Sequence, residues 1–210
     1  MPVVAEGLLA ATPVATPEGW CPAGDLSPGD HVLTFDDGPQ PVLSVYMATI
    51  TDPPPALWPL RVPPWALDNR DEITLLPQQR VLIEADQAEV LFGDPFALIP
   101  AEALEHWRGI ARARPAHGEA VVQLTFARPQ ILYASRGVLL SCAGEDWAFP
   151  QPGWGDEAGE ALFTDPGHSV CSLQQGRHLI ACLMAEEAGA ALSAAARGGW
   201  FRRGGQGGGG

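Results

Sequence analysis

Hydrophobic and polar positions alternate in short runs over the first two thirds of the chain, and turn-forming residues separate these runs. His31–Phe35 alternates as a half-buried strand does, and Pro41–Ile50 is a further run with β character. Asp36-Asp37-Gly38-Pro39 forms a turn between them. Later apolar runs are Ile73–Leu76, Val81–Ile83, Ala120–Phe126 and Gln130–Ala134. Up to about Cys142 the pattern predicts a mainly β fold.

Three local predictions follow from the same pattern. Ala120–Phe126 and Gln130–Ala134 are close enough in sequence to pair as a hairpin. Glu89–Pro100 is expected to form two short apolar pieces joined at Gly93-Asp94-Pro95. Ala101–Arg108 is expected to form one or two helical turns.

Towards the C-terminus the hydrophobic period becomes helical. From about Leu173 to Ala196, one face carries Leu179, Ile180, Leu183, Met184, Ala188 and Leu192. Gly189 weakens this helix in its middle. We expect the apolar face to pack on the β domain or on a partner protein. The glycine-rich segment from Gly198 to Gly210 is expected to be a flexible tail.

These patterns divide the chain into a β domain over residues 7–145, a loop and helix over 146–197, and a tail over 198–210. The chain has 210 residues, 46% of them hydrophobic, which is enough for one domain with a core. Its formal charge is −13, and all twelve basic residues are Arg. This balance argues against nucleic acid or an anionic membrane as a partner, because both bind clustered positive charge.

Sequence signals for cofactors, metals and export are weak. The four cysteines (Cys21, Cys142, Cys171 and Cys182) form no CxxC pair and show no zinc spacing, so isolated thiols are expected, with no metal and no cofactor. Met1–Ala15 lacks the basic start of a signal peptide, and no run is long enough to span a membrane. A cytoplasmic location is therefore the default expectation.

Four stretches of the chain carry a recognisable set of motifs. They are Thr12–Gly19, Asp25–Thr34 followed by Asp37–Val42, Pro77–Ile83 followed by Glu89–Gly93 and Leu98–Ala101, and Gln123–Phe126 followed by Ile131–Ala134. Taken together they resemble the Hedgehog/intein (Hint) domain family, in the bacterial form common in alphaproteobacterial proteins. They occur in the family's order and cover roughly residues 7–145. The resemblance implies a horseshoe-like β fold.

It also implies a chemistry. Hint domains act on the peptide bond that precedes them: a first-position Cys or Ser attacks the preceding carbonyl, giving an N-to-S or N-to-O acyl shift. A His in the middle block, three residues after a Thr or Ser, contacts the scissile amide and protonates the leaving nitrogen.

This chain departs from the family at each of these positions. The first position falls on Gly7, the middle His on Gln79, and the Ser or Thr before it on Leu76. An Asp and a His often found in the last hairpin fall on Ala127 and Pro129, on either side of Arg128. An amide such as that of Gln79 donates hydrogen bonds but exchanges no proton at neutral pH. The resemblance therefore implies no catalytic residues here.

A shifted alignment could place the nucleophile elsewhere. Cys21 and Ser27 are the nearest candidates, but neither has a His at the expected place, and Ser27 is most simply a turn residue. His31 is expected to be an exposed strand histidine. His168 and His178 flank Cys171, which raises a thiol or metal site as a minor alternative.

Three functional hypotheses remain open on the sequence. The first is a catalytically degenerate autoprocessing module that acts as a scaffold or binding domain. The second is an active self-cleaving domain in which other residues replace the nucleophile and the His. The third is a relic under little functional demand, which would fold poorly.

Overall fold

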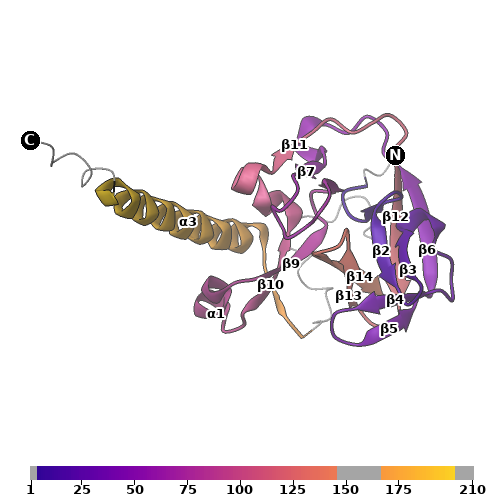
Figure 1. The fold of residues 1–210 in the computed structure, drawn as a ribbon. Helices are drawn as coiled ribbons and strands as arrows, with labels where there is room; N and C mark the ends of the chain where they lie inside the picture. The colour runs from indigo at the N-terminus through magenta and orange to yellow at the C-terminus, as the bar shows by residue number, and fades with distance from the viewer. Residues whose placement is uncertain (1–3, 146–166, 202–210) are drawn as a thin grey trace, which may run out of the picture.

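The structure, a computed structural model, describes residues 4–145 and 167–201 of the chain. These residues form a β body from which one long C-terminal helix extends (Figure 1). The mainly β fold with a C-terminal helix is confirmed. The described strands are β1 (Leu8–Leu9), β2 (Pro13–Thr16), β3 (Gly19–Pro22), β4 (His31–Thr34), β5 (Gly38–Pro41), β6 (Ser44–Thr49), β7 (Leu60–Val62), β8 (Ile73–Leu75), β9 (Arg80–Glu84), β10 (Phe96–Pro100), β11 (Ala111–Arg112), β12 (Ala120–Phe126), β13 (Gln130–Ala134), β14 (Val138–Gly144) and β15 (Ser169–Val170).

The helical elements are fewer. Two α-helices are described, α1 (Asp86–Phe92) and α3 (Leu173–Phe201). The short 3-10 turns are η1 (Ala23–Asp25), η2 (Pro55–Leu57), η3 (Ala101–Leu104) and η4 (Trp107–Gly109). The helical turns expected between Ala101 and Arg108 are therefore present, as η3 and the start of η4.

The larger sheet does not contain the hairpin expected between Ala120–Phe126 and Gln130–Ala134. β12 pairs antiparallel with β6 over six residue pairs. It also pairs antiparallel with β1 and parallel with β14. β13 pairs instead with β14, through a turn in which Ser135 and Arg136 have φ values of 45° and 59°. The prediction was wrong because β1, β6 and β14 already occupy the edges of β12, which leaves no edge for β13.

The helix α1 replaces the first of the two apolar pieces expected in Glu89–Pro100; the second is strand β10. The buried side of α1 carries Ala88, whereas Val90 is 78% exposed, so the burial follows a helical period. Gly93 ends the helix with φ 81°, a left-handed conformation that glycine adopts without strain. The short length of this helix concealed its period in the sequence.

The long helix α3 begins with a capping box. The backbone N–H of Gln175 donates to Ser172 Oγ at 3.3 Å, and the N–H of Ser172 donates to Gln175 Oε1 at 2.8 Å. The helix is continuous through Gly189 and reaches Phe201, five positions beyond the expected end at Ala196. Residues 202–210, the rest of the expected tail, lie outside the described residues, as does most of the expected loop (146–166).

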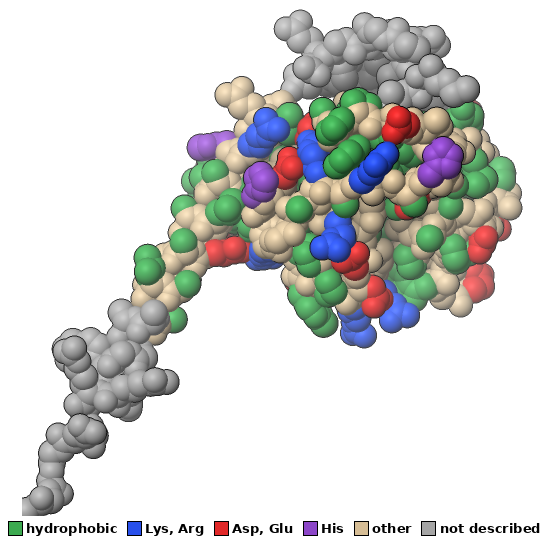
Figure 2. All heavy atoms as spheres, turned by 90° about the horizontal axis from the view of Figure 1, so that it is seen from above, with side chains coloured by type: hydrophobic (Ala, Val, Ile, Leu, Met, Phe, Trp, Pro, Cys, Tyr) green, Lys and Arg blue, Asp and Glu red, His purple; other side chains and the backbone are tan. Residues whose placement is uncertain are grey.

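Only the first part of α3 packs on the β body. Leu179 and Ile180 are buried against η3 and β10, but Met184 and Leu192 are 41% and 73% exposed. Gly176 allows the close approach, because a Cβ there would lie 3.0 Å from that of Ala103. In Figure 2 the outer part of the helix carries mostly apolar side chains, with acidic ones near its exit from the body. Among the described helices, none has the length and hydropathy to cross a membrane.

Candidate functional site

The candidate site lies where the start of the β domain meets the turn before β9. Strand β1 pairs with β12, which places Gly7 against the core, and Gln79 follows the turn at Pro77 and Gln78. The backbone N–H of Gly7 donates a hydrogen bond of 3.2 Å to Gln79 Oε1, although the two residues are 72 positions apart. The structure thus brings together the two positions that the sequence resemblance assigns to the nucleophile and to the histidine.

The side-chain amide of Gln79 is fully engaged. Its side chain is 1% exposed, and its Nε2 donates to the carbonyl oxygens of Ser141 at 2.8 Å and Arg80 at 3.1 Å. These two acceptors fix the orientation of the amide, so that the oxygen faces Gly7. A primary amide held this way donates and accepts hydrogen bonds, but it carries no proton to a leaving nitrogen.

Leu76 contributes packing rather than polarity to the site. It is 1% exposed and forms a small apolar cluster with Leu9, Ile50 and Val121. A hydroxyl group there would have to find a partner inside this cluster.

Residue 7 has no space for a side chain. Gly7 has φ 127°, and a Cβ atom built on it would lie 2.7 Å from Val121 Cγ1 and 3.0 Å from the carbonyl oxygen of Val122. A nucleophilic side chain would therefore require both a strained backbone and a displacement of β12 side chains. Gly7 itself offers no nucleophilic side chain, and the space beside it is closed to one.

The peptide bond between Glu6 and Gly7 is held at both ends by side-chain amides. Gln79 accepts from its N–H, and Gln123 Nε2 donates to its carbonyl oxygen, that of Glu6, at 3.1 Å. One residue earlier, the carbonyl of Ala5 accepts from the backbone N–H of Gln78 at 2.9 Å. This arrangement docks residues 5–7 against the β body and polarises the amide between Glu6 and Gly7.

Sequence reasoning did not identify Gln123 as part of the site. It lies in β12 between Val122 and Leu124, which are buried, and is itself half-buried. A polar residue in an otherwise apolar strand was the available signal, but the strand alone does not say what that residue meets.

Ionisable groups near the site are shifted towards their neutral forms. Burial raises the pKa of Glu6 to about 7, and the charge of Arg80 partly opposes this rise. Burial, followed by the charge of Glu6, raises the pKa of Cys142 well above its usual range. Burial also raises the pKa of Cys171 to about 11, against the effect of Arg80, whose Nη1 donates to the Cys171 carbonyl at 2.9 Å. These thiols are protonated at neutral pH and are poor nucleophiles.

The positions that the resemblance assigns to an Asp and a His in the last hairpin, Ala127 and Pro129, lie directly after β12. Ala127 and Arg128 are exposed, and Arg128 pairs with Asp37 at 3.2 Å on the surface. Pro129 packs against Gly144, where a Cβ would lie 2.8 Å from the proline Cδ.

The remaining sequence candidates lie in several places. Cys21 is half-buried in β3, and its thiol pKa is raised by burial and by Asp25 and Asp30. Ser27 is confirmed as a turn residue whose N–H donates to Asp30 Oδ2 at 2.8 Å, and His31 is exposed at the start of β4.

His168 and Cys171 do not form a site with His178. His168 Nε2 lies 3.2 Å from Asp36 Oδ1, and its ring contacts those of Phe35 and Phe96. His178 is exposed on α3, whereas Cys171 is buried. The described residues contain no cluster of three or more His, Cys, Asp or Glu able to hold a metal ion.

Comparisons with known proteins point to one family. The chain resembles the solved structure of the MchDnaB-1 intein with 17% identity over 64% of this chain and 98% of that one, at a TM-score of 0.41. It also resembles a bacterial intein-like domain from Clostridium thermocellum with 12% identity over 65% and 99% of the two chains, at a TM-score of 0.48. No curated protein matches the sequence. The model of the Hint domain matches residues 7–140, and the chain therefore belongs to the Hint domain family.

Proposed function

We propose that this chain is a catalytically inactive Hint domain that keeps its N-terminal segment attached and acts as a scaffold or binding module. The observation that carries the proposal is the environment of Gly7. The Gly7 N–H donates to the amide oxygen of Gln79, whereas protonation of a leaving nitrogen requires a titratable group at this place. The surrounding residues also leave no space for a nucleophilic side chain at position 7.

The docked N-terminal segment supports the same proposal. Three hydrogen bonds, from Gly7, Gln123 and Gln78, hold residues 5–7 against β12 and the turn before β9. If the segment is never released, these hydrogen bonds persist in the mature protein. There they stabilise the folded state by holding residues 5–7 beside β12.

A partner protein that binds through α3 is part of the proposal. Residues 184–194 of the helix are all exposed, and Glu186 and Glu187 are their only charged residues. Such a surface is less charged than an ordinary exposed helix, which favours protein contact over solvation.

The test is the intact mass of the chain with a short peptide fused to its N-terminus, incubated with and without dithiothreitol or hydroxylamine. We expect a single unchanged mass and a cooperative thermal transition. Release of the fused segment at the Glu6–Gly7 bond would establish the active, self-cleaving alternative. A chain without a cooperative transition would support the relic hypothesis instead.

A matched variant, Gly7→Cys with Gln79→His, restores the family's residue types at two positions. We expect this variant to remain uncut as well, because Val121 occupies the space of the new Cβ. Efficient cleavage would show that the closed geometry is not what prevents the reaction.

A further inference from the structure

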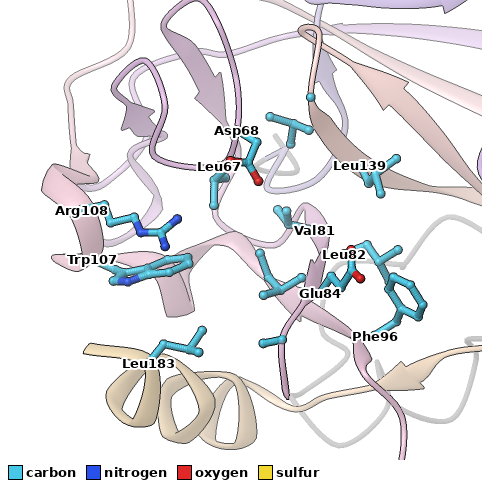
Figure 3. A pocket seen from close by; sticks show the side chains of 14 residues that line it. Leu67, Asp68, Val81, Leu82, Glu84, Phe96, Trp107, Arg108, Leu139 and Leu183 are labelled. Atoms are coloured by element: carbon cyan, nitrogen blue, oxygen red, sulfur yellow. The ribbon is translucent and has the colours of Figure 1, made fainter. Parts of the chain in front are cut away.

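A second site candidate is a pocket of about 320 Å³ (Figure 3), which shares β9 and β14 with the site at Gly7 but is lined by other residues. Strands β9 and β14, the loop before Asn69, the turn η4 and the helix α3 enclose it. Val81, Leu139 and Leu183 give it apolar walls, and Trp107 lies along one side. The charged side chains at the pocket are Asp68, Glu84 and Arg108.

The positive charge in this pocket is already neutralised. Arg108 Nε and Nη2 both bind Glu187 Oε1, at 2.8 Å and 2.7 Å, and its Nη1 donates to the carbonyl of Ala66 at 3.0 Å. The guanidinium carbon lies 4.3 Å from the centre of the Trp107 ring. The guanidinium donors and the charge of Arg108 are therefore already engaged within the protein, and the group is not available to bind an anionic ligand.

The two carboxylates are in the opposite situation. Within residues 4–145 and 167–194, neither the Asp68 nor the Glu84 side chain has a hydrogen bond or an ion pair. Both are exposed at the pocket, one on the loop and the other at the end of β9. The pocket consequently combines apolar walls with two uncompensated negative charges.

The loop that carries Asp68 is rigidly built. The Asn69 side chain, fully buried, accepts from the N–H of Leu67 and donates to the carbonyls of Pro63 and Asp71. Gly137 of the neighbouring turn lies so close that a Cβ there would be 2.4 Å from the Asp68 carbonyl oxygen. The carboxylate is thus presented by a fixed loop, which lowers the ordering cost of binding.

We infer that this pocket binds the basic side chain, Arg or Lys, of a partner polypeptide, with its apolar stem along Val81 and Leu183 and its charge between Asp68 and Glu84. The volume is at the lower end of ligand pockets and suits a single side chain. The chain's charge of −13 attracts basic partners. Trp65, 68% exposed in the same loop, adds apolar contact surface that a polypeptide could cover and a small free cation could not.

The test compares two synthetic peptides, acetyl-Leu-Arg-Leu-amide and its citrulline analogue, in which a neutral urea replaces the guanidinium. Binding is measured by NMR titration on the full chain. We expect the arginine peptide to shift the Trp107 indole and Leu183 methyl signals, and the citrulline peptide to bind about tenfold more weakly. The variant Asp68→Asn with Glu84→Gln should lose about tenfold in affinity, since each partly exposed ion pair contributes roughly two- to fivefold.

The control variant, Glu18→Gln with Asp25→Asn, removes the same charge from exposed sites elsewhere and should bind as the unmodified chain does. Equal binding of the two peptides, equal losses in both variants, or no binding at all would overturn the inference. Agmatine binding as tightly as the arginine peptide would also overturn it, by assigning the pocket to a free cation. The carboxylates are exposed, so the variants are expected to fold, and their thermal transitions verify this.

Discussion

At the residue scale, Gly7 is held by two separate constraints, its backbone conformation and the side chains around it. Gly19 provides a matched comparison, because its φ of 128° is nearly the same as that of Gly7 but a Cβ there would meet nothing within 4 Å. The difference between the two positions therefore isolates the steric closure of the site.

We expect Gly7→Ala to lower the free energy of unfolding by about 1–3 kcal/mol more than Gly19→Ala does, the usual cost of overpacking a core. Chemical denaturation of both variants measures this difference. Adding Val121→Ala should recover part of the loss, because Val121 Cγ1 is the nearest obstacle. Equal destabilisation at positions 7 and 19 would mean that the site has room for a side chain.

Gln79 is expected to stabilise the fold through its hydrogen bonds. Gln79→Leu removes the partners of the buried Gly7 N–H and of the Ser141 carbonyl, and each unsatisfied group costs about 1–3 kcal/mol. We therefore expect a loss of about 2–4 kcal/mol in urea denaturation. Gln78→Leu, at the exposed neighbouring position, should change stability by less than about 0.5 kcal/mol. Similar losses in both variants would contradict this role for Gln79.

Glu6 should make stability depend on pH in a defined direction. Its pKa rises from 4.5 to about 7 on folding, so between these values the native state binds more protons than the unfolded chain. The stabilisation of the folded state that comes from protonated Glu6 is therefore complete below pH 4.5, and it is lost as the pH rises through 7.

Glu6→Gln removes this dependence. Because the side chain is partly accessible, we expect the stability of the variant relative to the unmodified chain to increase by about 1–2 kcal/mol between pH 5 and pH 8. Unfolding free energies at the two pH values test this. A constant difference would show that the carboxyl is not desolvated.

At the element scale, α3 consists of a packed first part and a free outer part. Leu179 is fully buried, whereas Leu192, on the same predicted helical face, is 73% exposed. The sequence period correctly identified a helix, but it could not show where the β body ends and the apolar face loses its support.

Leu179→Ala is accordingly expected to cost about 2–5 kcal/mol, and Leu192→Ala less than about 0.5 kcal/mol. Thermal or chemical denaturation of the two variants compares the parts directly. A large effect of Leu192→Ala would mean that the outer part of α3 is buried in solution, for instance by a partner.

Two other elements show the limits of local pattern. The predicted start of the C-terminal helix at about Leu173 rested on hydrophobic period alone, and the capping box at Ser172 and Gln175 was a second signal in the sequence that went unused. In contrast, α1 has seven residues, too few for a clear period. Two of the three partners of β12, β1 and β6, lie more than 70 positions away in the sequence.

At the scale of the whole molecule, the site and the pocket are products of topology. Gly7, Gln79, Gln123 and Ser141 belong to four separate segments of the chain and meet because β1, β12, β9 and β14 share one sheet system. The pocket is likewise lined by residues from β9, β14, a loop and α3, and no single one of these elements forms it. The two differ in accessibility: the amide site is closed, and the pocket is open.

The sequence by itself determined the mainly β class, the C-terminal helix and the family, and it predicts that Gly7, Leu76 and Gln79 stand where the family carries other residue types. These properties are local, since periodicity, turn residues and ordered motifs are all readable along the chain. Only the tertiary structure decided that Gln79 binds the Gly7 N–H, that Val121 closes the space beside it, and that Gln123 holds the preceding carbonyl. Such contacts depend on strand register and on the distance between side chains far apart in sequence, and no local pattern encodes either of these.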